Sequence, residues 1–411
     1  MDFTFTPEQD ALREQAREFL AANAEPTWAQ IAELGWTGVS VAEEDGGAGL
    51  SFLEEAVLFE ELGRALYRGP YFATVGLTLP ALPAELRAEV AAGEASWTLA
   101  FGPLVPDLDT ATRVAIVGGD GIYELEGAER EVLTTTDESR PLGVVRGGEP
   151  GRRLADSSVL PEIEARSQTA LALEACGVAR LALEDALEYA SSREQFGKKI
   201  GVYQAVSHPL ADAYTYVELS RSLALWAAWC VATGDAQAPI AASAAKSYAG
   251  ESAVRVCETA IQSLGGIGFT WEHRLHRLYK RALGIESFGA SGTRLRAEIA
   301  AMRGDVRVVV WMQAEIERVR DESADGGAHV RLEMLRVVPH ERSDAVAVLE
   351  PELPEADDEL LRPRDEVGVR VAVPALVGQA ARDLLVAVEL VRAAHDCGHV
   401  ELVVHHQALH D

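Results

Sequence analysis

The spacing of apolar residues divides the chain into four segments. In the first, apolar residues recur every three or four positions, both in a helix opened by Thr6 and Pro7 and on either side of a glycine-rich loop at Gly46–Gly49. In the second, short apolar runs are broken by Gly, Pro and Asp, as is typical of strands. The pattern therefore predicts an N-terminal helical domain at 1–95 and a small β-domain at 96–158.

Helical periodicity returns in residues 166–303. Three long alanine-rich segments, 170–192, 206–234 and 238–266, are followed by two shorter helical patterns. Long amphipathic segments joined by short connections are typical of an antiparallel bundle. We therefore expect a mostly α-helical fold with one small β-domain, ending in a helical bundle at 159–303.

Residues 304–411 form an extension whose composition differs from the rest. Trp311 is its only aromatic residue, whereas seven of the ten histidines of the chain lie in it. The acidic stretch 350–366 indicates a disordered linker, and residues 371–396 favour one more helix. The sequence assigns this extension no role.

The histidines near the end of the chain raise a metal hypothesis. His395 and His399 have the i, i+4 spacing of a helical metal pair, and Cys397 lies between them. However, no acidic or cysteine residues converge on them, and scattered histidines are usually not ligands. We therefore expect no metal site.

Charge and composition exclude several classes of function. Apolar residues make up 48% of the chain and the net charge is −28, which disfavours nucleic acid and anionic membrane surfaces as partners. The longest apolar run, 223–232, is too short to span a bilayer, and the acidic start is unlike a signal peptide. The four cysteines form no CxxC pair, which favours a cytoplasmic protein without disulfides.

Two connections between predicted helices carry residues suited to an anionic ligand. In "REQFG", Arg193 can bind a pyrophosphate bidentately, Phe196 can flank a flat ring, and Gly197 lets a backbone come close. In "LGGIGFTWEH", Gly265 and Gly266 end a helix, and the loop amides can meet phosphate or ribose oxygens. Thr270 is expected to cap the next helix. Taken singly, each connection is also compatible with an ordinary structural turn.

Four stretches together resemble the acyl-CoA dehydrogenase family. They are "FTPEQDALREQAREFL", "LGWTGVSVAEEDGGAGLSFLEEAVLFEELGRAL", "REQFGKKIGVYQAVSHPLAD" and "LGGIGFTWEH", in the order of the family, and the resemblance covers residues 1–303. It implies a helical domain, a middle β-domain and a C-terminal four-helix bundle, assembled as dimers or dimers of dimers. It also implies FAD as the cofactor.

The resemblance implies a set of FAD-binding residues. In the family, the arginine of the REQFG-type motif reaches the FAD pyrophosphate across a dimer interface, which makes Arg193 that residue here, with Gln195 and Phe196 beside it. Further positions that match FAD contacts of the family are Gln204, Gln262, Gly265, Gly266 and Thr293.

The catalytic base of the family is missing from its usual place. The family reaction needs a carboxylate to take the α-proton of an acyl-CoA while the β-hydrogen leaves as hydride. The residue before Gly292 is Ser291, whose hydroxyl is far too weakly acidic for that role. Some members carry the base early in the first bundle helix, where this chain has Ser167 or Gln168. Displaced candidates are Glu174 and Glu286, each of which also has an ordinary structural interpretation.

The β-domain departs from the family as well. The segments at 99–106 and 125–129 lack the acidic residue and the lysine that help to hold the flavin in the family, and the domain is shorter than usual. We therefore expect a weakened flavin site in the chain itself, with its contribution across the interface retained.

Three interpretations follow from this resemblance. The chain is the non-catalytic, FAD-completing subunit of a heteromer with another acyl-CoA dehydrogenase-like chain, or an autonomous dehydrogenase with a relocated base, or a flavin oxidase with a different base. The heteromer interpretation is favoured, because the usual base is absent and the β-domain is shortened, whereas the Arg193 loop is kept. Each implies an acyl-CoA or other acyl-thioester substrate and lipid metabolism, and the dehydrogenases also imply an electron-accepting flavoprotein. The acyl group itself is left open.

Overall fold

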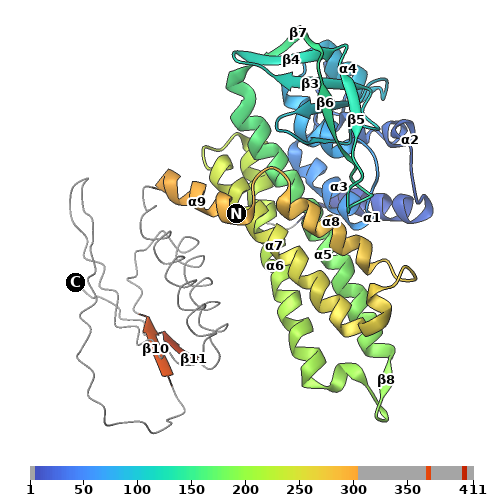
Figure 1. Ribbon diagram of the computed structural model, residues 1–411, viewed down its shortest axis with the longest axis vertical. Helices are drawn as coiled ribbons and strands as arrows, with labels where there is room; N and C mark the ends of the chain where they lie inside the picture. The colour runs from blue at the N-terminus through green and yellow to red at the C-terminus, as the bar shows by residue number, and fades with distance from the viewer. Residues whose placement is uncertain (1–4, 304–366, 372–399, 405–411) are drawn as a thin grey trace, which may run out of the picture. The chain divides into compact units, whose positions relative to one another are not determined.

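The computed structural model describes residues 5–303, 367–371 and 400–404 (Figure 1). Contacts divide the chain into two units, Met1–Val306 and Arg307–Asp411. Within the described residues no helix is long and apolar enough to cross a membrane. No cluster of metal-binding side chains occurs in the same residues.

The first unit begins with short helices whose starts are encoded locally. They are α1 (Pro7–Ala22), α2 (Trp28–Glu33), α3 (Phe52–Arg64) and α4 (Ala84–Ala91). Between them lie the 3₁₀ helices η1 (Trp36–Gly38), η2 (Glu43–Asp45) and η4 (Leu79–Ala81) and the π-helix η3 (Phe72–Thr78). The expected cap of α1 is confirmed, since Thr6 and Gln9 form a reciprocal capping box. Ser51 and Glu54 open α3 in the same way.

The β region consists of two small sheets. Its strands are β1 (Trp97–Ala100), β2 (Val105–Pro106), β3 (Arg113–Val117), β4 (Gly121–Glu126), β5 (Glu129–Val132), β6 (Leu142–Arg146) and β7 (Glu149–Asp156). One sheet has the order β1-β3-β4-β7 and the other β2-β6-β5. Between them, Val105, Leu108 and Val114 form a small core separate from the main one.

The helical bundle dominates the rest of this unit. Its helices are α5 (Leu160–Ser192), α6 (Gln204–Thr233), α7 (Ala238–Leu264), α8 (Leu275–Ser287) and α9 (Gly292–Arg303), joined by η5 (Ser157–Val159), β8 (Glu194–Gln195), β9 (Lys198–Lys199), η6 (Ile200–Val202) and η7 (Gly265–Phe269). Buried alanines line α5 and α7, so these helices can approach closely. A mostly helical fold with a small β region is thereby confirmed.

The elements differ from the sequence prediction in three places. Helix α5 begins at Leu160, about three turns earlier than expected, because Pro161 suits its first turn. Strands β6 and β7 had no recognised pattern, since each has only one buried residue. Thr270 does not cap α8: its hydroxyl donates to the Ile267 carbonyl, and α8 starts only at Leu275. The domain limits at 95 and 158 stay predictions.

The second unit contributes one described element pair. Strands β10 (Val367–Val371) and β11 (Val400–Val404) pair in parallel. The expected linker at 350–366 lies outside the described residues. The expected helix at 371–396 does too, apart from Val371, which ends β10. The clustered histidines are also outside them.

Candidate functional site

Arg193 lies at the junction between the longest helix and a tight hairpin. It follows the last residue of α5, and strands β8 and β9 then pair antiparallel around Phe196 and Gly197. Both turn residues have positive φ, 53° and 75°, as a two-residue hairpin loop of this type requires. Glycine adopts this conformation freely, whereas a phenylalanine there is strained. The Phe196 side chain is 93% exposed.

The side chains of this hairpin are presented to the outside. Within the part of the chain that the structure describes, the Arg193 guanidinium has no ion-pair or hydrogen-bond partner, while its carbonyl accepts from the Ile200 amide at 2.9 Å. The Gln195 carbonyl accepts from the Tyr203 hydroxyl at 3.2 Å. Gln204, the first residue of α6, is exposed beside them. An unpaired arginine on a backbone fixed in this way can accept an incoming anion.

The second glycine loop is equally open. Helix α7 ends at Leu264, and Gly265 reverses the chain with a φ of 64°. A Cβ added at Gly265 or Gly266 would meet no atom within 4 Å, and Gln262 is exposed nearby. The Gly265 amide itself closes α7, because it donates to the Ile261 and Gln262 carbonyls, but the surface at the two glycines is open to a ligand outside this chain.

An ion pair places this second loop relative to the first. Arg274, which follows η7, forms a bidentate pair with Asp185 at 2.6 and 2.9 Å, and Asp185 lies two turns before the end of α5. Both loops are thereby anchored to the part of α5 that leads into the hairpin. Phe269 and Trp271 in the second loop are 71% and 69% exposed. Exposed aromatic residues of this size are typical of a surface that another molecule covers.

These two loops fit part of an FAD molecule. An unpaired guanidinium suits a pyrophosphate, an exposed ring suits a flat heterocycle, and glycine amides suit ribose or phosphate oxygens. Because these groups face outward, they suit a cofactor seated mainly on another subunit.

Ser291 has a structural partner at the expected position of the base. Its hydroxyl accepts from the Arg294 amide at 3.4 Å, and its carbonyl accepts from the Leu295 amide at 3.0 Å. These are the contacts of an N-cap residue at the start of α9. Thr293, the second residue of the same helix, is exposed, and its hydroxyl accepts from the Arg296 guanidinium at 3.4 Å.

Glu174 lies in a buried ionic cluster. Nη2 of Arg140 lies 2.6 and 2.5 Å from its two carboxylate oxygens, and Nη1 of Arg281 lies 3.4 Å from one of them. Arg281 also donates to Asp137 at 2.9 Å and to the Tyr67 carbonyl at 3.2 Å. With both oxygens engaged by arginine, Glu174 has the surroundings of a structural carboxylate.

The same cluster contains a carboxylate without a full set of partners. Asp107 is 2% exposed and has a φ of 52°. Among the described residues its Oδ2 finds no hydrogen-bond partner, and neither do the Tyr67 hydroxyl and Nη1 of Arg140. Burial raises the pKa of Asp107 to about 7, although Arg140 and Arg281 oppose that shift. The cluster joins the β region to the N-terminal helices and the bundle.

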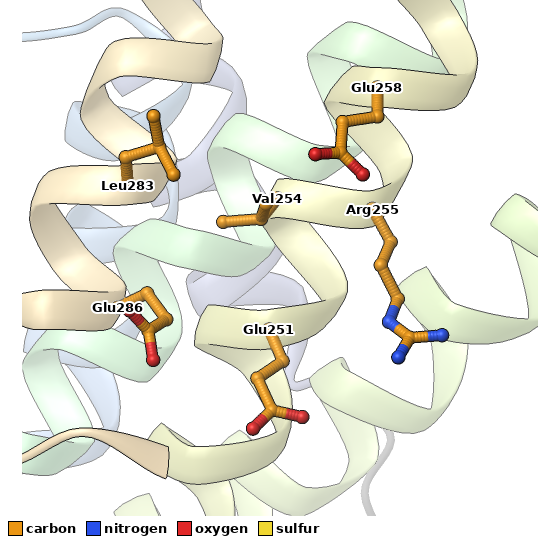
Figure 2. Close-up of a pocket in the computed structure, with 6 residues that line it drawn as sticks. All are labelled: Glu251, Val254, Arg255, Glu258, Leu283 and Glu286. Carbon is orange, nitrogen blue, oxygen red and sulfur yellow. The ribbon is translucent and has the colours of Figure 1, made fainter. Parts of the chain in front are cut away.

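Glu286 lines a surface groove between α7 and α8, shown in Figure 2. The groove has a volume of about 260 Å³, and its other lining residues are Glu251, Val254, Arg255, Glu258 and Leu283. Three carboxylates against a single guanidinium disfavour binding of an anionic ligand such as an acyl-CoA. Nothing in this groove places Glu286 against an acyl thioester.

The early part of α5 holds a carboxylate that the sequence did not single out. Gln168, at one of the alternative base positions, donates to Glu164 at 3.2 Å and accepts from Ser243 at 3.0 Å. Burial, followed by the charge of Glu298, raises the pKa of Glu164. The Ser167 hydroxyl donates to the carbonyl of the same glutamate at 3.1 Å. The signal was the position one turn before Gln168 on the same helix face.

Comparison with known proteins gives a consistent family. A model of the acyl-CoA dehydrogenase N-terminal domain matches residues 6–83, and one of the C-terminal domain matches residues 165–315. Acyl-CoA dehydrogenase FadE34 of Mycobacterium tuberculosis is 36% identical over 347 residues, 78% of this chain but 48% of FadE34. The chain thus spans about half the length of that relative. Acyl-CoA dehydrogenase IpdE2 of the same organism is 33% identical, over 63% of this chain and 81% of IpdE2.

Solved structures agree with this fold. A variant of the Tcur3481-Tcur3483 steroid ACAD has a TM-score of 0.66 at 26% identity, covering 73% of this chain and 99% of its own. The ChsE4-ChsE5 complex of M. tuberculosis has a TM-score of 0.67 at 22% identity, covering 74% and 99%. FAD is the cofactor of the family, as in the FAD complex of PigA, a structural neighbour with a TM-score of 0.64 at 20% identity, and the open loops around Arg193 and Gly265 fit it. The chain belongs to the acyl-CoA dehydrogenase family.

Proposed function

We propose that this chain is the non-catalytic, FAD-completing subunit of a heteromeric acyl-CoA dehydrogenase. The observation that carries the proposal is the contrast between two loops. Ser291 stands at the position of the base as the N-cap of α9, whereas the Arg193 guanidinium has no partner among residues 5–303. A chain with this pair of features can complete a cofactor site but cannot take the α-proton at the usual place.

In this proposal the division of labour follows from the residues. Bound FAD supplies the hydride acceptor for α,β-desaturation of the acyl thioester. Arg193 would neutralise the pyrophosphate, with Gln195 beside it, and the Phe196 ring would flank a flat ring of the cofactor. The open backbone at Gly265 and Gly266 would let the cofactor approach from the other loop. Gln204, Gln262 and Thr293 are the further candidates for contacts. The partner chain supplies the glutamate base, so proton abstraction occurs on its side of the interface.

Two similarities support a heteromer with a bulky substrate. The neighbours in structure include the Tcur3481-Tcur3483 steroid ACAD and the ChsE4-ChsE5 complex. We therefore place a second acyl-CoA dehydrogenase-like chain as the partner, and an acyl-CoA of lipid metabolism as the substrate. One relative, at 37% identity over 110 residues, is CarC of a caffeyl-CoA reductase-Etf complex. This supports an electron-transferring flavoprotein as acceptor. The described cysteines are free and buried, which supports a cytoplasmic location.

An autonomous enzyme is the alternative that one observation favours. Glu164 lies one turn from the early base position and has a raised pKa, as a general base needs. It is also a surface carboxylate, which does not match the apolar cleft that the chemistry requires. Oxygen consumption with acyl-CoA substrates would distinguish an oxidase from a dehydrogenase within this alternative.

Anaerobic flavin reduction tests the proposal. The chain alone, a glutamate-bearing partner alone and their mixture are each supplied with FAD and an acyl-CoA, and the flavin absorbance is followed. Bleaching is expected in the mixture at a rate that neither chain reaches alone. Equal bleaching by this chain alone would mean that it is an autonomous enzyme.

A further inference from the structure

Lys246 occupies an unusual position in the middle of the bundle. It lies on α7 and is 2% exposed. Its ammonium donates to three backbone carbonyls, those of Glu286 at 3.3 Å, Phe288 at 2.7 Å and Ala290. These acceptors belong to the end of α8 and to the loop that leads to Ser291.

The three acceptors match the three donors of an ammonium group. Carbonyls in the last turn of a helix have no partner within the helix, and a cation near that end is favoured by the helix dipole. Here Glu286 belongs to the last turn of α8, and Phe288 and Ala290 follow it. A neutral side chain of the same length would leave buried carbonyls without hydrogen bonds, which costs free energy.

Further contacts fix both sides of the same loop. The Phe288 ring packs edge-on against Phe72, with centroids 5.8 Å apart, and the Arg140 guanidinium lies 4.4 Å from the centre of that Phe72 ring. After the loop, Arg296 on α9 pairs at 2.6 Å with Glu251, one helical turn beyond Lys246 on α7. Residues 288–291 are therefore held from α7 and from the side of the buried cluster.

We propose that Lys246 is the positioning residue of the α8–α9 loop, fixing residue 291 and the start of α9 by holding three loop carbonyls. The loop would then form a fixed wall of the active site that this chain shares with its partner. In this chain the wall carries Ser291 at the position of the base. The role of the loop in a shared active site rests on the proposed function. The fixing of the loop by Lys246 does not depend on it.

Hydrogen exchange of the full-length chain tests the proposal. Amides of residues 287–292 are followed by mass spectrometry in the unchanged protein and in Lys246→Met, Lys246→Gln and Lys246→Arg. We expect exchange at least about tenfold faster in the methionine variant, an intermediate rate in the glutamine variant, and partial rescue by arginine. Lys280→Met is the matched control, because the Lys280 ammonium lies 4.8 Å from the Trp271 ring instead.

The pattern of exchange separates positioning from general stability. Faster exchange confined to the loop, with α5 and α6 unchanged, would support the proposal. Unchanged loop exchange in the methionine variant would overturn it, and so would loosening spread evenly over the bundle. If the methionine variant does not fold, the glutamine and arginine variants still test the proposal: loop exchange should be faster with glutamine than with arginine, and equal rates would overturn it. A mixture that binds no flavin would count against the proposed function but would leave the exchange result standing.

Discussion

Arg140 and Glu174 form a buried ion pair in which one guanidinium nitrogen lies 2.6 and 2.5 Å from the two carboxylate oxygens. Arg140 lies in the loop between strands β5 and β6, and Glu174 lies on α5. The pair therefore links two parts of the fold that are far apart in the chain. Removing one member of such a pair leaves the other charge buried without compensation.

Replacing Glu174 with glutamine should destabilise the protein strongly. Arg140 would lose its buried ion-pair partner and Arg281 would keep only Asp137, so we expect the free energy of unfolding to fall by about 3–5 kcal/mol. Urea unfolding measures this. Glu286→Gln is the control, with an expected change below about 1 kcal/mol, because Glu286 is only partly buried in the surface groove. Unaltered stability together with lost flavin reduction would instead identify Glu174 as a displaced base.

The stability of the protein should depend on the titration of Asp107. Its pKa is about 7 in the folded chain against an ordinary value of 3.8, so the folded state binds more protons between these values. Stability contributed by the protonated form is complete below about pH 4 and is lost as the pH rises through about 7.

Asp107→Asn removes this dependence while keeping a residue that tolerates the positive φ at this position. As the pH rises from about 4 to about 7, the free energy of unfolding of the unchanged protein should fall, relative to that of the asparagine variant, by up to about 1.4 kcal/mol per pH unit. Urea midpoints of both proteins at pH 5 and pH 8 provide the comparison. If the difference between the urea midpoints of the two proteins is the same at pH 5 and pH 8, the predicted pH dependence from Asp107 is wrong.

Arg193→Met should weaken flavin binding by the complex without affecting the fold. A bidentate, charge-assisted contact to a phosphate is worth about 1.5–3 kcal/mol, which corresponds to roughly a 10- to 100-fold rise in the Kd for FAD. Fluorescence titration of the complex with FAD measures it. The matched control is Arg152→Met in β7, which lies at the opposite end of the described body from β8 (Figure 1). Equal losses in both variants would argue against a specific role for Arg193.

Ser291→Ala should affect stability but not chemistry. Loss of the N-cap of α9 should cost about 0.5–2 kcal/mol, visible as a lower unfolding midpoint. Flavin reduction by an acyl-CoA in the complex should keep its rate, since the serine takes no proton. Ser287→Ala is the control, because its hydroxyl only donates to carbonyls within α8. A large fall in the reduction rate at unchanged stability would mean that Ser291 contributes to the reaction.

The sequence predicted those elements whose signals are local. Helix starts such as Thr6 with Gln9 depend on residues three apart, and the bundle helices depend on periodicity within one segment. Strands β6 and β7 escaped prediction, because few of their residues are buried and alternation is weak in such strands. The early start of α5 was missed since its first turns mix charged and apolar residues.

The site could be anticipated only where a family motif carries it. Arg193 and Gly265 lie in short contiguous motifs, and the fold leaves both open. The buried cluster joins Arg281 to Asp137, 144 positions away, and Arg140 to Glu174, 34 positions away, and no spacing rule connects these residues. Lys246 was equally hidden, because its partners are backbone carbonyls, which a sequence does not distinguish.

The absorption spectrum of the purified chain, alone and then with a glutamate-bearing partner, tests the central claim most directly. The account predicts a chain without flavin absorbance when alone, and a complex with a bound flavin that an acyl-CoA bleaches. A strong flavin spectrum in the chain alone, bleached by an acyl-CoA, would contradict it and would direct the search for a base to Glu164.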